Sequence, residues 1–193
     1  MLFSCSGEVE NIQEEPVSQF SEKNFTLVPN PLEPQEILVN KTSEASLKKA
    51  ETDRGRYNIS LRYLVNLNER QLQVFESAAA RWERIIIKDV PSITGTIPSA
   101  FNGVPPIEGT IDDIVIEVVV APIDGPGGIL GQAGPRFVRV PGGLPISGVM
   151  YFDEADLDFL DELDLFEDVI VHEMGHVLGV GTLWNFQERI LRE

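Results

Sequence analysis

Apolar and polar residues alternate over residues 57–66, where the regular part of the chain begins. The apolar positions are Tyr57, Ile59, Leu61, Tyr63 and Val65, and the residues between them are polar except for Leu64. Because successive side chains of a strand point to opposite faces, this alternation predicts a strand with one buried face.

A helix is predicted directly after this strand. Asn68 can cap its first turn, and Gln71 stands at the reciprocal position of a capping box. Apolar residues then recur at spacings of three and four, at Leu72, Phe75, Ala79, Trp82 and Ile86. This stripe predicts an amphipathic helix that ends near Pro91 and packs one face on the core.

The rest of the pattern completes a layered domain. The almost continuous apolar run at 114–120 predicts a strand buried on both faces, and 149–152 predicts a short strand. A helix is predicted from about Phe166 to Gly179. Two segments rich in Gly and Pro, 91–113 and 121–146, separate these elements and lack the pattern of a phosphate-binding loop. The order strand–helix–strand–strand–helix indicates an α+β or α/β domain.

Residues 1–56 differ in composition from the rest of the chain. They are rich in Glu, Ser, Asn, Pro and Lys, and their few apolar residues show no sustained period. Such a segment cannot bury enough surface to offset its chain entropy. We therefore expect a disordered linker or pro-segment at 1–56 and one domain at 57–193.

The start of the chain bears on its location. The stretch Leu2-Phe3-Ser4-Cys5 resembles a bacterial lipobox, in which the cysteine becomes lipidated. This resemblance implies an extracellular or surface protein with a lipid anchor at Cys5, preceded by a truncated signal. A solitary thiol and a latency cysteine are the alternatives that the sequence leaves open.

Charge and composition exclude several classes of function. The chain has 15 Lys and Arg against 31 Asp and Glu, a net charge of −16, which argues against a nucleic-acid partner. One cysteine excludes an intrachain disulfide, and no apolar run is long enough to span a membrane. Nine acidic residues fall between Asp153 and Asp168, which is typical of a solvated face or loop, or of a hard-cation site.

The only two histidines of the chain stand four residues apart, as His172 and His176, with Glu173 between them. On a helix this spacing places both imidazoles on one face, about 6 Å apart along the axis, and two nitrogen ligands suit zinc. Glu173 is then placed to accept a proton from water at the metal. The opposite face carries Ile170, Met174, Val177 and Leu178, which can pack on a sheet. A pair of histidines satisfied within the core is the alternative.

The segment that follows resembles a known family. Residues 172–181 read HEMGHVLGVG and resemble the active-site helix of the metzincin metallopeptidases, HExxHxxGxxH, in which the glycine permits a sharp turn. The continuation at Thr182, Leu183 and Trp184 looks most like leishmanolysin and its bacterial relatives, where an insertion precedes the third histidine. Residues 128–135 resemble the metzincin edge strand, and 148–153 resemble the strand before the active helix.

This resemblance covers about 57–185 and implies the N-terminal subdomain of a zincin. Its fold would be α+β, with a twisted mixed sheet, a backing helix and the active-site helix. The resemblance implies a zinc endopeptidase with His172 and His176 as metal ligands and Glu173 as general base and acid. The substrate peptide would add as a strand along Gly128, Ile129, Leu130 and Gly131. Structural calcium would bind at Asp153, Glu154 and Asp156.

The chain departs from the family in two respects. A catalytic zinc normally has three protein ligands, yet the sequence holds no third histidine and no methionine turn after His176. We therefore expect the N-terminal part of a longer protease that, alone, binds zinc weakly and is nearly inactive. The alternatives are a catalytically inactive adhesion or binding module with the protease fold, and a zincin that acts on a non-peptide substrate.

Overall fold

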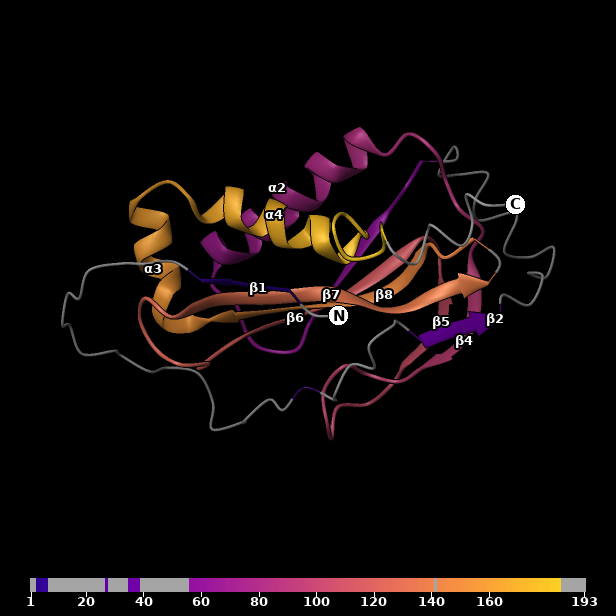
Figure 1. The fold of residues 1–193 in the computed structure, drawn as a ribbon, viewed down its shortest axis with the longest axis horizontal. Coiled ribbons are helices and arrows are strands. Elements are labelled where there is room, and N and C mark those ends of the chain that lie inside the picture. The colour runs from indigo at the N-terminus through magenta and orange to yellow at the C-terminus, as the bar shows by residue number, and fades with distance from the viewer. Residues whose placement is uncertain (1–2, 7–26, 28–34, 39–55, 141, 185–193) are drawn as a thin grey trace.

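The computed structural model describes residues 3–6, 27, 35–38, 56–140 and 142–184. Within them the protein is an α+β structure, as the sequence predicts, with helices above a mixed sheet and a small hairpin below it (Figure 1). The elements are β1 Phe3–Ser6, β2 Gln35–Leu38, β3 Ile59–Tyr63, α2 Glu69–Ile85, β4 Ile93–Ile97, β5 Ile107–Ile111, β6 Ile114–Ala121, β7 Ile129–Val140, β8 Pro145–Asp153, α3 Glu154–Glu162 and α4 Phe166–Val177.

The main sheet mixes parallel and antiparallel pairs. Its order is β1-β7-β8-β6-β3, with β2 also paired to β7. Strand β6 lies parallel to β3 and to β8, whereas β7 runs antiparallel to β8. The outer edge of β7 takes two short strands, β1 antiparallel and β2 parallel.

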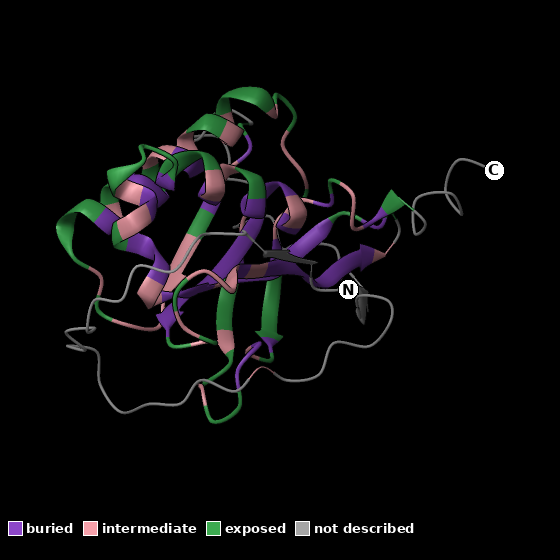
Figure 2. Cartoon of the chain, turned by 60° about the vertical axis from the view of Figure 1, so that its left-hand side comes forward, coloured by how far each residue is buried: buried purple, intermediate pink, exposed green. Residues whose placement is uncertain are grey.

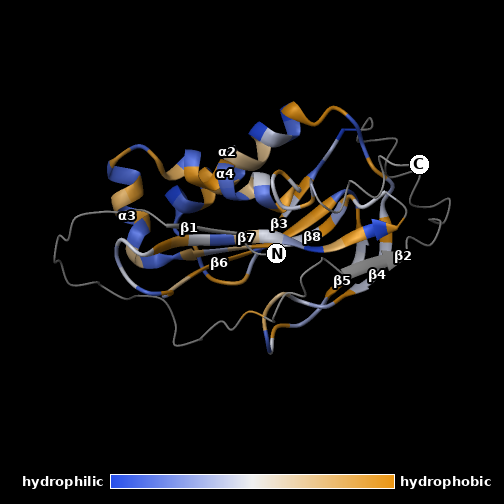
Figure 3. Ribbon diagram, viewed as in Figure 1, coloured by the Kyte–Doolittle hydropathy of each residue, from blue (hydrophilic) through white to orange (hydrophobic). Residues whose placement is uncertain are grey.

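Helices α2 and α4 cover one face of this sheet. Phe75 of α2 lies at the centre of the core, edge-on to Phe152 of β8 at 5.6 Å and to Phe166 of α4 at 6.2 Å between ring centroids. Every residue of β6 is buried, as its unbroken apolar run predicts (Figure 2). Figure 3 shows the same apolar strands beneath helices that carry both hydrophilic and hydrophobic residues.

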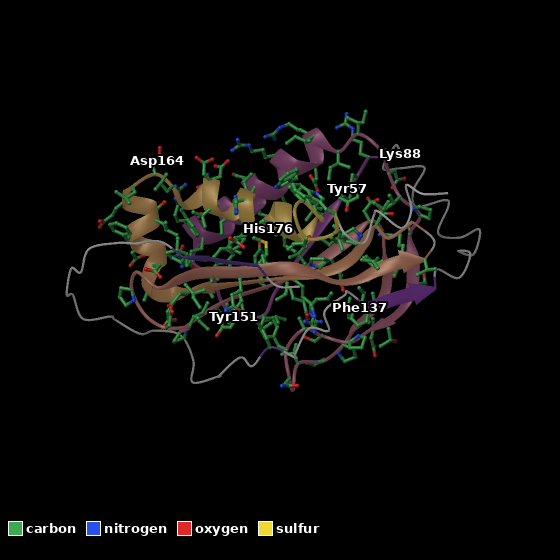
Figure 4. The ribbon with its side chains drawn as sticks, viewed as in Figure 1. Tyr57, Lys88, Phe137, Tyr151, Asp164 and His176 are labelled. Carbon is green, nitrogen blue, oxygen red and sulfur yellow. The ribbon has the colours of Figure 1, made fainter. Side chains whose placement is uncertain are left out.

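The opposite face of the sheet is covered by the hairpin β4–β5. Ile93, Ile97 and Ile111 of the hairpin pack against Val115, Phe137 and Ile146 of the main sheet. In Figure 4, Phe137 and Tyr151 accordingly lie on the other side of the sheet from His176. The sequence pattern missed this hairpin within the Pro- and Gly-rich connection 91–113. Only the ends of β4 are buried, so the strand has no sustained alternation to detect.

The first predicted helix begins where expected and ends early. Asn68 accepts a hydrogen bond from the Gln71 amide, and the Gln71 side chain accepts one from the Asn68 amide, so the capping box is confirmed. The prediction that the helix ends near Pro91 is wrong, because α2 ends at Ile85. Beyond it Ile86 is extended, and the Val90 amide donates to the Asp113 carboxylate instead of continuing the helix.

Part of the acidic run forms a helix that the pattern did not predict. Asp153 caps α3 by accepting a hydrogen bond from the Ala155 amide. Leu157 and Leu160 are buried, so α3 has an apolar face beneath its acidic one. Most acids of the run lie on a solvated face, as expected, whereas Asp153 and Asp156 are buried.

Most of the predicted tail, 7–26, 28–34 and 39–55, lies outside the described residues. The described parts, β1, β2 and Leu27, pair with the domain, and Leu27 forms an isolated bridge with Phe101. No helix in the described part of the chain combines the length and apolar character needed to cross a membrane.

Gly148 allows α4 to approach the sheet. A Cβ added there would lie 2.2 Å from Val177 Cγ1 of α4 and 3.0 Å from the Gly134 carbonyl oxygen. We expect Gly148→Ala to lower the free energy of unfolding by about 1–3 kcal/mol, the usual cost of overpacking, as measured by urea denaturation. The matched control is Gly95→Ala on the exposed hairpin, where a Cβ meets nothing within 4 Å.

The overlap with Val177 can be tested separately. Because Val177→Ala removes Cγ1, we expect Gly148→Ala to be less destabilising in that background than in the wild type. Additive effects of the two substitutions would contradict this account of how α4 is seated.

Candidate metal centre

Helix α4 is held with its histidines away from the core. Ile170, Met174 and Val177 are fully buried against the sheet, as predicted, and Leu178 is partly buried. Trp82 of α2 fixes the other side of the helix by donating from Nε1 to the Val171 carbonyl at 2.9 Å. His172 is exposed and His176 is half-buried, so both stand on the solvent side of α4.

The two imidazoles converge on one point. Their Nε2 atoms lie 3.1 Å apart, and the rings are close to perpendicular, with centroids 4.7 Å apart. Two nitrogens bound to one tetrahedral zinc at 2.0–2.1 Å would lie about 3.4 Å apart. The separation of the two nitrogens, which is also that of a hydrogen bond between the rings, therefore lies within a few tenths of an ångström of the separation in a shared zinc site.

A backbone carbonyl fixes the protonation of His176. The Nδ1 atom of His176 lies 2.9 Å from the carbonyl oxygen of Val180, which can only accept a hydrogen bond. In the neutral ring Nδ1 must therefore carry the proton, and Nε2 is left with a lone pair. Histidines that ligate metals commonly donate their other ring N–H to such a partner.

Glu173 is a buried carboxylate without a hydrogen-bond partner. Its side chain is fully buried, and neither Oε1 nor Oε2 has a partner in the structure. Burying a carboxylate without a partner is strongly unfavourable, and such exceptions call for an explanation. Two imidazoles and a carboxylate on one helix have the donor chemistry of a zinc site, so the residues present fit a zinc ion.

The glycine after the motif ends the helix as expected. Gly179 has a φ of +103°, its amide donates to the His176 carbonyl at 3.2 Å, and the Val180 amide donates to the Gly175 carbonyl at 2.9 Å. These two bonds form a Schellman motif. The chain then folds back, and the Thr182 hydroxyl donates to the His176 carbonyl at 2.7 Å. Sequence reasoning assigned no role to Val180 or Thr182, although the spacing of Gly179 and Gly181 signals a tight turn.

The residues predicted to bind substrate lie at the outer edge of the sheet. Ile129, Leu130 and Gly131 begin β7, and Gly128 immediately precedes it. Strand β1 occupies this edge antiparallel, with Cys5 opposite Gly131 and Ser6 opposite Ile129. Helix α4 packs against β7, so the predicted substrate edge belongs to the strand beneath the metal centre.

Two of the carboxylates predicted to bind calcium hold a loop through hydrogen bonds. Asp153 accepts amide hydrogen bonds from Ile123, Asp124 and Gly125 at 2.8–3.1 Å, and Asp156 accepts one from Gly127 at 2.7 Å.

One oxygen of Asp156 and one of Glu154 are buried without a partner. Burial, with added repulsion from Asp153, raises the pKa of both carboxyl groups. The hydrogen bonds of Asp153 and Asp156 give these two residues a structural role. The calcium site at Asp153, Glu154 and Asp156 remains a prediction.

A second acidic cluster lies far from the histidines in the sequence. Oxygens of Asp89, Asp112 and Asp113 all lie within 4.8 Å of one another. The buried guanidinium of Arg139 donates to the carbonyl oxygens of Asp112 and Asp113. The guanidinium of Arg139 therefore already places a positive charge beside this cluster.

Asp113 makes stability depend on pH. Burial raises its pKa to about 7; amide bonds from Val90 and Asn58 oppose the rise, and Asp89 adds to it. A carboxyl group whose pKa is higher in the folded state stabilises the fold at low pH, and this contribution is lost as pH rises through about 7.

Lowering the pH from 7 to 5 should therefore stabilise the wild type relative to Asp113→Asn by on the order of 1 kcal/mol in urea denaturation. An equal pH dependence in the two proteins would contradict the raised pKa.

Comparisons with protein-family models, curated proteins and solved structures found no match for this chain. The function must therefore be inferred from the geometry of the site.

Proposed function

We propose that the protein is a zinc-dependent endopeptidase that uses His172 and His176 as metal ligands and Glu173 as its general base and acid. One observation carries the proposal: two imidazole Nε2 atoms 3.1 Å apart stand on the same helix as a buried carboxylate that has no partner. A structural histidine pair would not require a buried, unpaired Glu173 beside it.

The roles of the residues follow from their chemistry. His172 and His176 hold the ion through Nε2, and the Val180 carbonyl keeps the proton of His176 on Nδ1. Zinc, when bound, supplies a Lewis acid that polarises a carbonyl group and makes a water molecule more acidic. Glu173 would accept the proton of the attacking water and return it to the leaving amine, so its carboxylate would end each cycle unchanged.

Metal removal tests the proposal directly. We expect the chain alone to cleave an unstructured peptide only weakly, because the sequence supplies two of the three protein ligands of a catalytic zinc. This cleavage should stop when a chelator removes zinc and return when zinc is added back. Cleavage that survives complete zinc removal would overturn the proposal.

Substrate binding by strand addition requires an open edge on β7. Because β1 pairs with Ile129–Ala133, we expect deletion of residues 1–6 to expose this edge. Amide hydrogen exchange should become faster within Gly131–Ala133, and an extended peptide should bind more tightly. The Ile129 amide, which donates to the Asp124 carboxylate, and the segment 137–140, which pairs with β2, serve as internal controls. Unchanged exchange throughout Gly131–Ala133 would contradict this arrangement.

A catalytically inactive binding module is the second candidate, and the absence of a third histidine from the sequence favours it. The two proposals differ in their dependence on Glu173. A binding module should retain its partner after Glu173→Gln, whereas a peptidase should lose turnover. A surface location with a lipid at Cys5 remains a prediction from the sequence.

A further inference from the structure

The chain makes a closed turn immediately after α4. Gly179 and Gly181 both have positive φ, +103° and +77°. The Leu183 amide donates to the Gly179 carbonyl at 3.1 Å, and the Leu183 side chain is fully buried. A Cβ at Gly179 would lie 2.9 Å from Leu183 Cδ1, so the turn is packed as well as hydrogen-bonded.

This turn contacts His176 at two separate points. On the main chain, the His176 carbonyl accepts hydrogen bonds from the Gly179 amide and the Thr182 hydroxyl. On the side chain, the imidazole Nδ1 faces the Val180 carbonyl at 2.9 Å. Val180 lies between these two contacts, and its own amide donates to the Gly175 carbonyl at 2.9 Å. The direction of its carbonyl oxygen therefore depends on how the turn closes on its C-terminal side.

Thr182 contacts His176 through its side-chain hydroxyl, whereas Gly179 and Val180 contact it through backbone atoms. Val180 itself is 47 % exposed, so packing does little to fix its peptide groups. The hydrogen bond from Thr182, at 2.7 Å, closes the turn on its C-terminal side. Without it, the Leu183 amide still closes this side of the turn, but the peptide between Val180 and Gly181 is less restrained, and glycine offers little resistance to its rotation.

We propose that Thr182 is a positioning residue for the metal centre. Its hydroxyl holds the turn that presents the Val180 carbonyl to His176, which keeps the proton on Nδ1 and the lone pair on Nε2. Only one consequence of this role, tighter zinc binding, rests on the proposed function. The tautomer itself is a property of the zinc-free protein.

The test compares Thr182→Val, which removes the hydroxyl at nearly constant volume, with Thr182→Ser, which keeps it. In the zinc-free wild type, imidazole ¹⁵N shifts should show His176 protonated at Nδ1. Thr182→Val should give a mixture of tautomers, and Thr182→Ser should restore the wild-type spectrum. Zinc affinity, measured by competition with a fluorescent chelator, should fall by about 10–100-fold in Thr182→Val and recover in Thr182→Ser.

Each outcome decides a different point. If Thr182→Val keeps the wild-type tautomer of His176, the positioning role is overturned. An equal loss of zinc affinity in Thr182→Val and Thr182→Ser also overturns it. If the wild type binds no zinc but the tautomer still responds to Thr182, the positioning role stands and the proposed function fails. Thr182→Ala provides the same test with a smaller side chain should Thr182→Val fold poorly.

Discussion

Replacing His176 with alanine is expected to weaken zinc binding by at least about 100-fold. Loss of an outer hydrogen-bond partner alone typically lowers metal affinity by 10–100-fold, and removal of a ligand should have a larger effect. His172→Ala should have a similar effect, because the two Nε2 atoms converge on one point. Isothermal titration of the zinc-free chain measures both variants.

The matched control is Glu167→Gln, an exposed substitution on the same helix. It should leave zinc affinity unchanged, which separates loss of a ligand from a general change in charge on α4. Zinc binding that survives in the double variant His172→Ala/His176→Ala would place the metal elsewhere and contradict the site.

Replacing Glu173 with glutamine is expected to lower peptide cleavage by at least about 100-fold, the contribution typical of general acid–base catalysis. Glutamine keeps the shape of the side chain but cannot accept the proton. Zinc affinity should stay close to that of the wild type, because the imidazoles carry the metal. The effect should therefore appear in kcat and leave metal occupancy unchanged.

The same variant makes an independent prediction about stability. Because the Glu173 carboxylate is buried without a partner, its neutral replacement should stabilise the zinc-free fold by on the order of 1 kcal/mol. Urea denaturation without zinc measures this gain. A Glu173→Gln protein that is less stable than the wild type, or that cleaves as well, would contradict the assigned role.

Local signals in the sequence predicted the elements that form the site. Asn68 and Gln71 marked the start of α2, the unbroken run at 114–120 marked β6, and the histidine spacing marked the exposed face of α4. Each depends on residues within a few positions of one another, so pattern alone suffices. The sharp turn expected at Gly179 has the same local origin and is confirmed by its φ of +103°.

The missed features depend on contacts between distant segments. The segment that follows α2 is held by Asp113, 23 positions beyond Val90. The register of β1 on β7 joins residues more than a hundred positions apart, and no composition of a short segment specifies it. The role of Asp153 likewise depends on distant residues, because its carboxylate accepts hydrogen bonds from the amides of 123–125.

X-ray absorption at the zinc edge is the most direct test of the central claim that His172 and His176 share one zinc ion. The chain, loaded with one equivalent of zinc, should show two imidazole nitrogens at about 2.0–2.1 Å. This scattering should vanish when both histidines are replaced. Zinc held by oxygen ligands alone, or a chain that retains no zinc, would contradict the account.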